Sequence, residues 1–599
     1  MPITAWFTIL LLAAMFALLI KSDLPPVTIL VGALTLAVVF GLTSLENGIK
    51  GFSNPGVLTI GALLMVSAGM NATGAVGLIT DRIFGRTNSV RQTYVKLLPP
   101  VAMGSAFLDN ATVVPMLIPS LRNLCRRKRL PASKLFLPLS YAAILGGATT
   151  LIGTPANLII AGLVTDRLSN AHLKGSYLQE LHLFEPAWIG LPVAIFGIGI
   201  IYLLGQRLLP EKNKAVDLPH PLRVYRAEFR LRQNSPLVGQ TIQAADLTRF
   251  GGAELISFTQ ADNVEHQSNG NHRLQGGDIL AYKITGEDLP HLSKNPDLIP
   301  LNTIRKMETR RHTHQLVEVT AASTASVIGR KVSELSLLNH PYKVAVVAMS
   351  RQGRPLEHPL QDTRIETGDN VILEVDAAFF HHNRNETEFV LIRRVRGFQL
   401  QRTDRALTAT AITIAMVIVA ALGWTSLLAA AMLAAVFMLV TGCMDLRTAG
   451  RNVNFVNLTI LACSVGLETV VVDSGLSQNI ADLVIGLGVR IPHLALATIY
   501  MAMVVAANLI SGASAAALVF PVAVSLAGEL NLDFTPFAVT MMMGACPFIT
   551  PTATPTNLAV YGPGGYRFLD YIRLGVPLTI LSGTLTVFLV PIVFNVGSL

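Results

Sequence analysis

Two copies of a Thr-Pro-x-Asn motif interrupt apolar segments of the chain. The first copy is Thr154-Pro155-Ala156-Asn157, and the second, Thr554-Pro555-Thr556-Asn557, follows four hundred residues later. Proline lacks a backbone donor and clashes with the preceding turn, so each motif is expected to break its helix. Unwound backbone in a membrane is tolerated only where it lines a cavity or is buried in protein. The pair therefore predicts a two-halved transport site, against the alternative of two ordinary proline kinks.

A broken helix offers ligands for ions of both signs. Carbonyl groups at the end of its first part suit Na⁺, and N–H groups at the start of its second part suit an anion. Two polar tips between short apolar segments, Asp109-Asn110-Ala111-Thr112 and Ser511-Gly512-Ala513-Ser514, offer the same chemistry. Such a site needs no Arg or Lys within the bilayer, which would cost about 2.5 to 3.5 kcal/mol. We therefore expect one anion and flanking cations at these four segments.

The candidate site residues come from these four segments. The expected substrate ligands are Asn110, Thr112, Thr154, Pro155, Asn157, Ser511, Ser514, Thr554, Pro555 and Asn557. The expected Na⁺ ligands are Asp109, Asn110, Gly153, Ser511, Gly512 and Ala553. The alternative is that the Asn, Ser and Thr residues cap the half-helices, which is compatible with ligand contact. Asp109 is open to three interpretations: a Na⁺ ligand, a proton carrier or a helix cap.

The composition indicates an integral membrane protein. Of the 599 residues, 51% are hydrophobic and 14% are charged, against roughly 25% charged in a soluble domain. Lys and Arg total 46 against 37 Asp and Glu, and the surplus is local, which favours a topology signal over nucleic-acid binding. The four cysteines lack metal-ligand spacing and predict neither a disulfide framework nor a zinc site.

Residues 1–206 are expected to form a first transmembrane repeat. It would contain a re-entrant hairpin at 97–121, whose flanks are both basic and therefore cytoplasmic, and a broken helix at 135–164. The remaining spans are apolar runs long enough for a core of about 30 Å and lie at Ile3–Ile20, Val27–Thr43, Val57–Met70 and Ala187–Leu204.

Residues 403–599 are expected to form the second repeat. Its hairpin at 494–526 has no basic residue on its C-terminal flank and only Arg490 on its N-terminal flank, so it should open outward, and its broken helix lies at 537–560. The spans are Ala406–Leu422, Leu427–Val440, Val456–Val472 and Leu574–Val593, with Glu468 and Asp473 expected at the membrane interface. Leu108–Pro119 aligns with Ile510–Pro521 without a gap. Five crossings per half make the second copy inverted, so the fold class is an α-helical membrane protein of two inverted five-helix repeats, each with one hairpin.

Between the repeats, the composition becomes that of a soluble protein. Two α+β units are expected at 222–295 and 314–386, each with a Gly-Asp pair near its end, at Gly277-Asp278 and Gly368-Asp369. Neither unit contains a dinucleotide-binding glycine motif, a P-loop or a defensible catalytic constellation. We therefore expect a cytoplasmic α+β insert, no enzyme activity and no organic cofactor.

These motifs resemble those of the divalent anion/sodium symporter family. Asn110 and Ser511 match that family's Ser-Asn-Thr hairpin signatures, while the other tip positions depart from it. The sequences D-N-A-T-V-V-P-M-L-I-P, T-L-I-G-T-P-A-N-L and Y-G-P-G-G-Y-R-F-L-D-Y are similar to the sulfate-permease branch, and the insert resembles tandem C-terminal regulator-of-K⁺-conductance (RCK-C) domains. The resemblance implies an elevator mechanism, a homodimer surrounded by lipid, and a small-molecule or nucleotide regulator at the insert, which could equally be structural.

The leading hypothesis is a Na⁺-coupled symporter for a divalent anion in a bacterial inner membrane, with sulfate favoured over dicarboxylate. A proton- or cation-coupled antiporter of the same superfamily, with Asp109 as the titrating group, is the second hypothesis. A third is a nutrient sensor with a transporter-like membrane body. No nucleic-acid polymer is expected as a partner.

Overall fold

The computed structural model divides the chain into two units, Met1–Val216 with Thr403–Leu599, and Asp217–Arg402. It describes residues 3–21, 24–75, 89–128, 130–169, 178–211, 224–245, 247–250, 253–260, 265–267, 272–286, 289–293, 295, 297–301, 315–321, 327–335, 344–351, 353–356, 358–375, 389–394, 403–446, 449–450, 453–489 and 491–594. Outside these residues lie Arg82 and Arg86, in the basic flank before the first predicted hairpin, and Arg447 and Arg451, in a basic loop that follows the predicted span Leu427–Val440.

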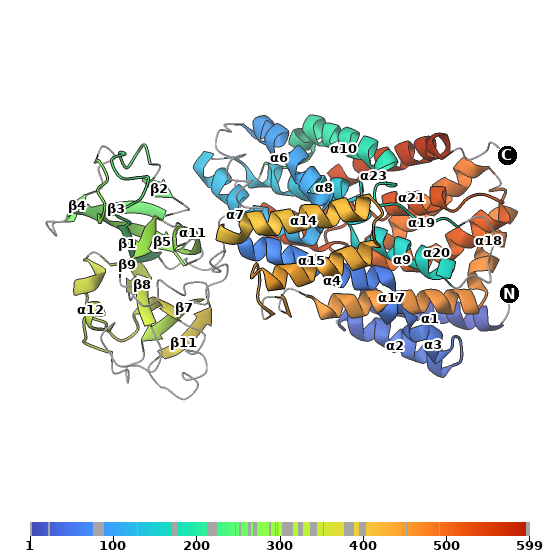
Figure 1. Cartoon of the computed structure of the whole chain (residues 1–599), viewed down its shortest axis with the longest axis horizontal. Helices are drawn as coiled ribbons and strands as arrows, with labels where there is room; N and C mark the ends of the chain where they lie inside the picture. Colours follow the sequence, from blue (N-terminus) through green and yellow to red (C-terminus); the bar gives the residue numbers. More distant parts are fainter. Residues whose placement is uncertain are drawn as a thin grey trace. The chain divides into compact units, whose positions relative to one another are not determined.

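The first unit is helical (Figure 1). Its N-terminal half contains α1 (Ile3–Lys21), α2 (Pro26–Val39), α3 (Leu45–Ile49), α4 (Pro55–Thr73), α6 (Val90–Ser105), α7 (Asn110–Lys128), α8 (Phe136–Gly147), α9 (Pro155–Ser169) and α10 (Ala187–Leu208). Its C-terminal half contains α14 (Ala406–Ala421), α15 (Leu427–Val440), α17 (Phe455–Asp473), α18 (Leu476–Gly486), α19 (Pro492–Leu509), α20 (Gly512–Glu529), α21 (Thr535–Gly544), α22 (Pro555–Gly564) and α23 (Phe568–Val593). Sequence periodicity did not predict the short helices α3 and α18.

Six helical stretches in the described part of the chain are long and apolar enough to cross a membrane. Both proline breaks are confirmed, because α9 begins at Pro155 and α22 begins at Pro555. Every residue of α8 and of α21, the helices that precede the breaks, is buried. The unwound backbone is therefore surrounded by protein on the side of these helices, as a membrane requires.

The two halves of the helical unit are interleaved, and their contacts are reciprocal (Figure 1). Helix α2 packs against α17, and α4 packs against α15. Helix α7 contacts α22, α9 contacts α20, and α10 packs along α23. If each helix is replaced by its sequence-aligned counterpart in the other half, these contacts map onto one another.

The position expected for Glu468 at the membrane interface remains a prediction. Its carboxylate is buried within the helical unit and forms an ion pair with Arg167 of α9, at 2.6 Å. Asp473, five residues later, accepts hydrogen bonds from the Thr43 hydroxyl at 2.7 Å and from the Asn47 amide at 3.2 Å. Sequence position near a helix end did not reveal the opposing arginine, which comes from a distant segment.

The second unit is built on one sheet in the order β11-β7-β10-β8-β1-β5-β3-β2. The main strands are β1 (Val224–Leu231), β2 (Arg249–Phe250), β3 (Ala253–Thr259), β5 (Ile279–Thr285), β7 (Gln315–Ala321), β8 (Val344–Arg351), β10 (Asn370–Val375) and β11 (Phe389–Arg394). The short strands β4 (Glu265–Gln267), β6 (Leu298–Pro300) and β9 (Arg354–Pro355) pair with β3, β1 and β8, and the short helices are α11 (Leu289–Ser293) and α12 (Val332–Leu335). Antiparallel pairing of β1 with β8 joins the two predicted α+β ranges into one sheet.

The two ranges repeat the same turn. Gly277 and Gly368 have φ of 99° and 86°, a region that favours glycine. The aspartate after each glycine accepts from a backbone N–H three residues earlier, Gln275 to Asp278 at 2.9 Å and Glu366 to Asp369 at 2.8 Å. The Gly-Asp repeat in the sequence therefore corresponds to a repeated structural element.

A buried charge network lies where the two ranges meet. The Glu228 carboxylate accepts from the Arg226 guanidinium at 2.9 Å and from the Leu360 backbone N–H at 3.0 Å. Arg226 also contacts Glu265 at 2.6 Å. Burial raises the pKa of the Glu228 carboxyl, and Arg226 offsets this only in part.

The Glu228 network gives a stability prediction for the purified fragment 217–402, which has its own apolar cores. Glu228→Ala should lower the free energy of unfolding by about 1 to 3 kcal/mol, because Leu360 and Arg226 lose a buried acceptor. The pKa of Glu228 is higher in the folded fragment than in the unfolded chain. Protonation of Glu228 therefore stabilises the folded state at low pH, and this stabilisation is lost as the pH rises through the folded-state pKa. Glu228→Gln keeps the acceptor and should flatten this loss in chemical denaturation measured from pH 5 to 8.

Asp362→Asn is the matched control, because the Asp362 and Lys331 side chains form an exposed ion pair at 3.3 Å. It should change the free energy of unfolding by about 0.5 kcal/mol or less. An Asp362 effect as large as that of Glu228→Ala would contradict the assignment.

Candidate functional site

In the first half, the tip of the helical hairpin faces the break. With its amide nitrogen toward the break, Asn110 at the start of α7 donates to the Gly153 carbonyl at 3.2 Å and to the Ala143 carbonyl at 3.1 Å. The same amide contacts the Ser105 hydroxyl at the end of α6. A Cβ on Gly147 would lie 2.6 Å from the Asn110 amide, so this approach requires glycine.

The second half brings its tip and break together in a similar way. The Asn508 side-chain oxygen, at the end of α19, accepts from the Ile549 backbone N–H at 3.3 Å. At Gly512, a Cβ would lie 2.4 Å from the Ala545 carbonyl oxygen, so the start of α20 lies directly against the break. Each polar tip is therefore fixed to the unwound segment of its own half.

The same pair of hydrogen bonds organises both breaks. The Thr150 hydroxyl donates to the Ala106 carbonyl, and the Thr550 hydroxyl donates to the Asn508 carbonyl at 3.2 Å. The backbone oxygens of these threonines accept from the motif asparagines, Asn157 at 2.7 Å and Asn557 at 3.0 Å. The unwound backbone is thus satisfied by side chains that recur at a spacing of four hundred residues.

The motif asparagines differ at their side-chain oxygens. Asn557 accepts from the Ser140 hydroxyl of α8 at 2.7 Å and also donates to the Pro547 carbonyl at 3.0 Å. The Asn157 oxygen is fully buried and has no hydrogen-bond partner among the residues that the structure describes. Four hundred residues after Ser140, α21 has Thr540, whose hydroxyl donates to the Pro536 carbonyl of its own helix at 2.8 Å. The first break therefore holds a buried acceptor available to a cation or a donor.

Three tyrosines surround the second break, and two of them, Tyr141 and Tyr566, connect the second half to the first. Tyr141 of α8 donates to the Phe548 carbonyl, and Tyr571 of α23 donates to the Asn557 carbonyl at 2.7 Å. The Tyr566 hydroxyl donates to the Ser133 carbonyl at 2.6 Å and accepts from the Leu137 N–H at 2.7 Å. These bonds are buried, and they hold α8, α22 and α23 as one body.

Several predicted ligands cap helices in this structure. The Thr154 and Thr554 hydroxyls accept from the Asn157 and Asn557 backbone N–H groups at 3.4 and 3.2 Å. Ser511 accepts from the Ser514 N–H at 3.2 Å. The capping interpretation therefore holds for all three residues, and it leaves ligand contact open because hydroxyl groups also donate.

The remaining predicted residues lie within or beside the same segments. Pro155 and Pro555 are the first residues of α9 and α22, and Gly153 and Ala553 are buried in the breaks. Ser514 is buried and accepts from the Ser464 hydroxyl of α17 at 3.0 Å. Thr112 is half-buried on α7. The Asp109 carboxylate, just before α7, accepts from the Ala111 backbone.

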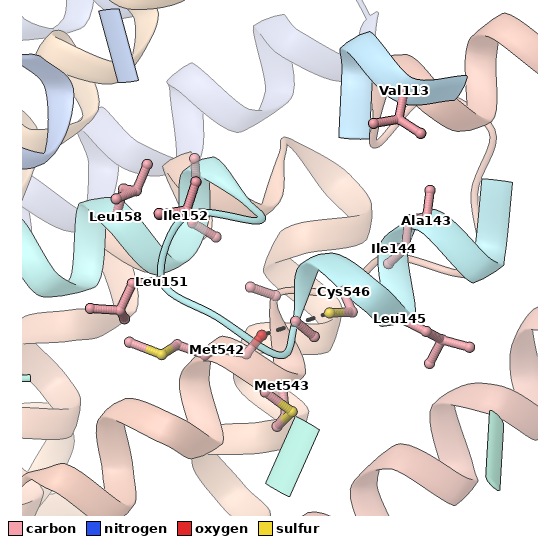
Figure 2. Close-up of a cluster of buried hydrophobic side chains, with 14 of the residues drawn as sticks. Val113, Ala143, Ile144, Leu145, Leu151, Ile152, Leu158, Met542, Met543 and Cys546 are labelled. Carbon is pink, nitrogen blue, oxygen red and sulfur yellow. Dashed lines mark hydrogen bonds between the residues drawn. The ribbon is translucent and has the colours of Figure 1, made fainter. Parts of the chain in front are cut away.

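The first break is packed against the end of α21 (Figure 2). Leu151 and Ile152 of the break lie in the same apolar cluster as Met542, Met543 and Cys546. The cysteine thiol is used locally, because it contacts the Met542 carbonyl at 3.8 Å. The two broken helices therefore share one apolar core, which restricts polar ligand contacts to the tips and caps.

Sequence reasoning missed the residues that satisfy the breaks, namely Thr150, Thr550, Asn508, Ser140 and the three tyrosines. A signal existed for the threonines, because they have the same spacing of four hundred residues as the motif prolines. Ser140 and the tyrosines act across the two halves, so an alignment of one half with the other does not identify them.

An apolar helical body with two broken helices and two polar tips defines a multi-pass membrane transporter. The citrate transporter family model matches residues 14–544 of this chain. Because this match covers most of the sequence, the chain belongs to the citrate transporter family.

Relatives align along nearly the whole chain. An uncharacterized transporter of Synechocystis is 27% identical in an alignment 579 residues long that covers 94% of this chain and 92% of the relative. A putative sulfur deprivation response regulator of Chlamydomonas reinhardtii is 26% identical over 577 residues, 93% of this chain and 96% of the relative. Sodium/sulfate cotransporter 1 of the same alga is 22% identical over 753 residues, covering 91% and 85%.

The difference between the two asparagines can be measured. Asn557→Ala should lower the melting temperature of the detergent-purified protein more than Asn157→Ala, because it leaves Ser140, Pro547 and Thr550 without a buried partner, at about 1 to 3 kcal/mol for each unsatisfied group. Asn157→Ala removes one side-chain bond, to Thr150. Melting followed by size-exclusion chromatography gives the comparison, and equal shifts would contradict the asymmetry.

Proposed function

We propose that this chain is a secondary transporter that couples uptake of a divalent anion, sulfate before dicarboxylate, to Na⁺. The observation that carries the proposal is the duplicated break, in which Thr150 and Asn157 make the same hydrogen bonds as Thr550 and Asn557. A transport site built from two related halves is typical of secondary transporters. The names of the sodium/sulfate cotransporter relatives favour this substrate and cation.

The two halves are proposed to be inverted repeats of five crossings and one re-entrant hairpin each. Reciprocal packing supports this, since the α2–α17 and α4–α15 contacts exchange under the sequence alignment and the α10–α23 contact maps onto itself. A two-fold axis in the membrane plane would relate such halves. The insert would then lie in the cytoplasm of a bacterial cell.

Four helix N-termini supply the proposed anion site. Helices α7, α9, α20 and α22 all begin at a tip or a break, and the partial positive charge at each start favours an anion. The substrate ligands would be hydroxyl, amide and backbone donors at Asn110, Thr112, Thr154, Pro155 and Asn157 and their partners in the second half, Ser511, Ser514, Thr554, Pro555 and Asn557.

The proposed Na⁺ ligands are oxygens at the same segments. The unpartnered side-chain oxygen of Asn157 supports a cation at the first break, because Na⁺ would satisfy a buried acceptor. Carbonyl or side-chain oxygens of Asp109, Asn110 and Gly153 lie in this half, and Ser511, Gly512 and Ala553 would serve the second. The bound cations would neutralise the charge of the anion.

Two groups of helices are proposed to move against each other in an elevator mechanism. The transport body consists of α6–α10 and α19–α23, and the frame consists of α1–α4, α14, α15 and α17. The buried tyrosine bonds within the body support its movement as one piece. A homodimer in lipid would hold the frame in place, and the insert, proposed to be RCK-C-like, would bind a small-molecule or nucleotide regulator.

Transport in proteoliposomes tests the proposal directly. Labelled sulfate should accumulate when an inward Na⁺ gradient is imposed and should not accumulate when choline replaces Na⁺, with labelled succinate as the competing substrate. Asn157→Ala should reduce Na⁺-driven uptake by at least about tenfold, a loss of about 1.4 kcal/mol in binding. Absence of uptake of either anion under any cation gradient would contradict the proposal.

Proton coupling through Asp109 is the second candidate, because its carboxylate lies at the hairpin tip beside Asn110. Under Na⁺ coupling, Asp109→Asn should weaken the apparent Na⁺ affinity and leave the pH profile of exchange unchanged. Under proton coupling, the same variant should abolish pH-dependent exchange. Measuring counterflow across pH at fixed Na⁺ distinguishes these outcomes.

A further inference from the structure

An ion pair crosses the boundary between the transport body and the frame. Arg167 of α9 contacts Glu468 of α17 at 2.6 Å, and their side chains are 20% and 7% exposed. The Arg167 guanidinium also lies over the Phe520 ring of α20, 5.1 Å from the ring centroid. Arg167 therefore packs against α20 of the transport body, while its guanidinium forms an ion pair with α17 of the frame.

Breaking the Arg167–Glu468 ion pair while the helices keep their positions would cost free energy, because of the charges around Glu468. Asp166 and Asp473 lie close enough to act on the Glu468 carboxylate by charge repulsion. Removing Arg167 would thus leave a buried carboxylate among like charges, and removing Glu468 would leave a largely buried guanidinium without its partner. Breaking a buried ion pair on one side is strongly destabilising for that reason.

Three further contacts between described residues at this boundary are small and neutral. A Cβ on Gly56 of α4 would lie 2.2 Å from the Leu158 carbonyl of α9, and one on Gly162 would lie 2.5 Å from the Gly56 nitrogen. Ser464 of the frame donates to Ser514 of the body at 3.0 Å. Glycines allow two helices to pack closely without interlocking side chains. The charged contact is thus of a different kind from its neighbours.

The pair has no counterpart at the aligned position of the other half. The position aligned with Glu468 is Ala68, and α22, the counterpart of α9, ends at Gly564 before any arginine. An ion pair that is present in one half of the repeat stabilises one arrangement of the transport body and the frame. A contact present in both halves would stabilise both arrangements.

We propose that Arg167 and Glu468 form a latch that holds the transport body against the frame in this arrangement and opens in each transport cycle. The proposal rests on the proposed function for the identity of the moving parts. The free energy of the ion pair acts on the balance between two arrangements of the transport body and the frame. None of the hydrogen bonds described above joins a proposed site residue to the side chain of Arg167 or Glu468.

Disulfide trapping reports on the latch without substrate. In a background with the four native cysteines replaced, Ser464→Cys and Ser514→Cys place thiols where two hydroxyls now touch, so oxidation should join them in this arrangement. Adding Glu468→Gln should slow cross-linking at least about fivefold by shifting the population. Arg167→Gln should have the same effect, and the charge-reversed pair Arg167→Glu with Glu468→Arg should restore most of the rate.

Glu211→Gln is the control, because the Lys134–Glu211 pair at 3.3 Å joins segments within the transport body. It should leave cross-linking unchanged. Unchanged cross-linking in both single variants, or a failure of the charge-reversed pair to recover it while the protein elutes as a monodisperse species, overturns the latch. If the single variants do not fold, recovery by the charge-reversed pair still decides the outcome.

The result is separable from the transport assay. Cross-linking is measured in membranes without anion or Na⁺, so a protein that carries neither sulfate nor succinate can still show the latch. Because Ser514 is itself a proposed substrate ligand, uptake is compared only within the double-cysteine protein, before and after oxidation, and oxidation should block the uptake that the reduced form retains. Uptake that continues in fully cross-linked protein would overturn the role of this boundary in the cycle.

Discussion

Unwound backbone in the middle of an apolar helical body must find its hydrogen bonds within the protein, and this requirement shapes both halves of the structure. Thr150 and Thr550 bond to the last turn of the neighbouring hairpin helix, and Asn157 and Asn557 return a bond to those threonines. Without them, each break would expose donors and acceptors at a cost of several kcal/mol. The breaks can therefore present helix N-termini to a ligand only because these side chains form hydrogen bonds with the other backbone groups of the unwound segments.

The duplicated framework is not used identically in the two halves. The second break is completed from outside its own half by Ser140 and Tyr141, and Tyr566 of the second half bonds to Ser133 of the first. The first keeps an unsatisfied oxygen at Asn157, and the Arg167–Glu468 pair is found only on its side of the alignment. A repeat that retains its fold while its polar contacts diverge can assign different tasks to the two halves.

Much of this architecture was accessible from the sequence because it follows from local chemistry. Proline at positions 155 and 555 determines where the second part of each broken helix begins, and apolar length identifies the long helices. The capping roles of Thr154, Thr554 and Ser511 were among the stated alternatives. Contacts between distant segments were not accessible. Nothing near Glu468 in the sequence indicates Arg167, and nothing near Asn557 indicates Ser140, because tertiary packing alone brings these pairs together.

The bond from Ser140 to Asn557 has a consequence for biogenesis. The donor is synthesised more than four hundred residues before its acceptor, so a newly inserted N-terminal half already presents this hydroxyl when α22 leaves the ribosome. N-terminal segments generally fold first during synthesis. The early half would then act as a template on which the later broken helix acquires its final shape, whereas a C-terminal half produced alone would lack the group that its buried amide needs.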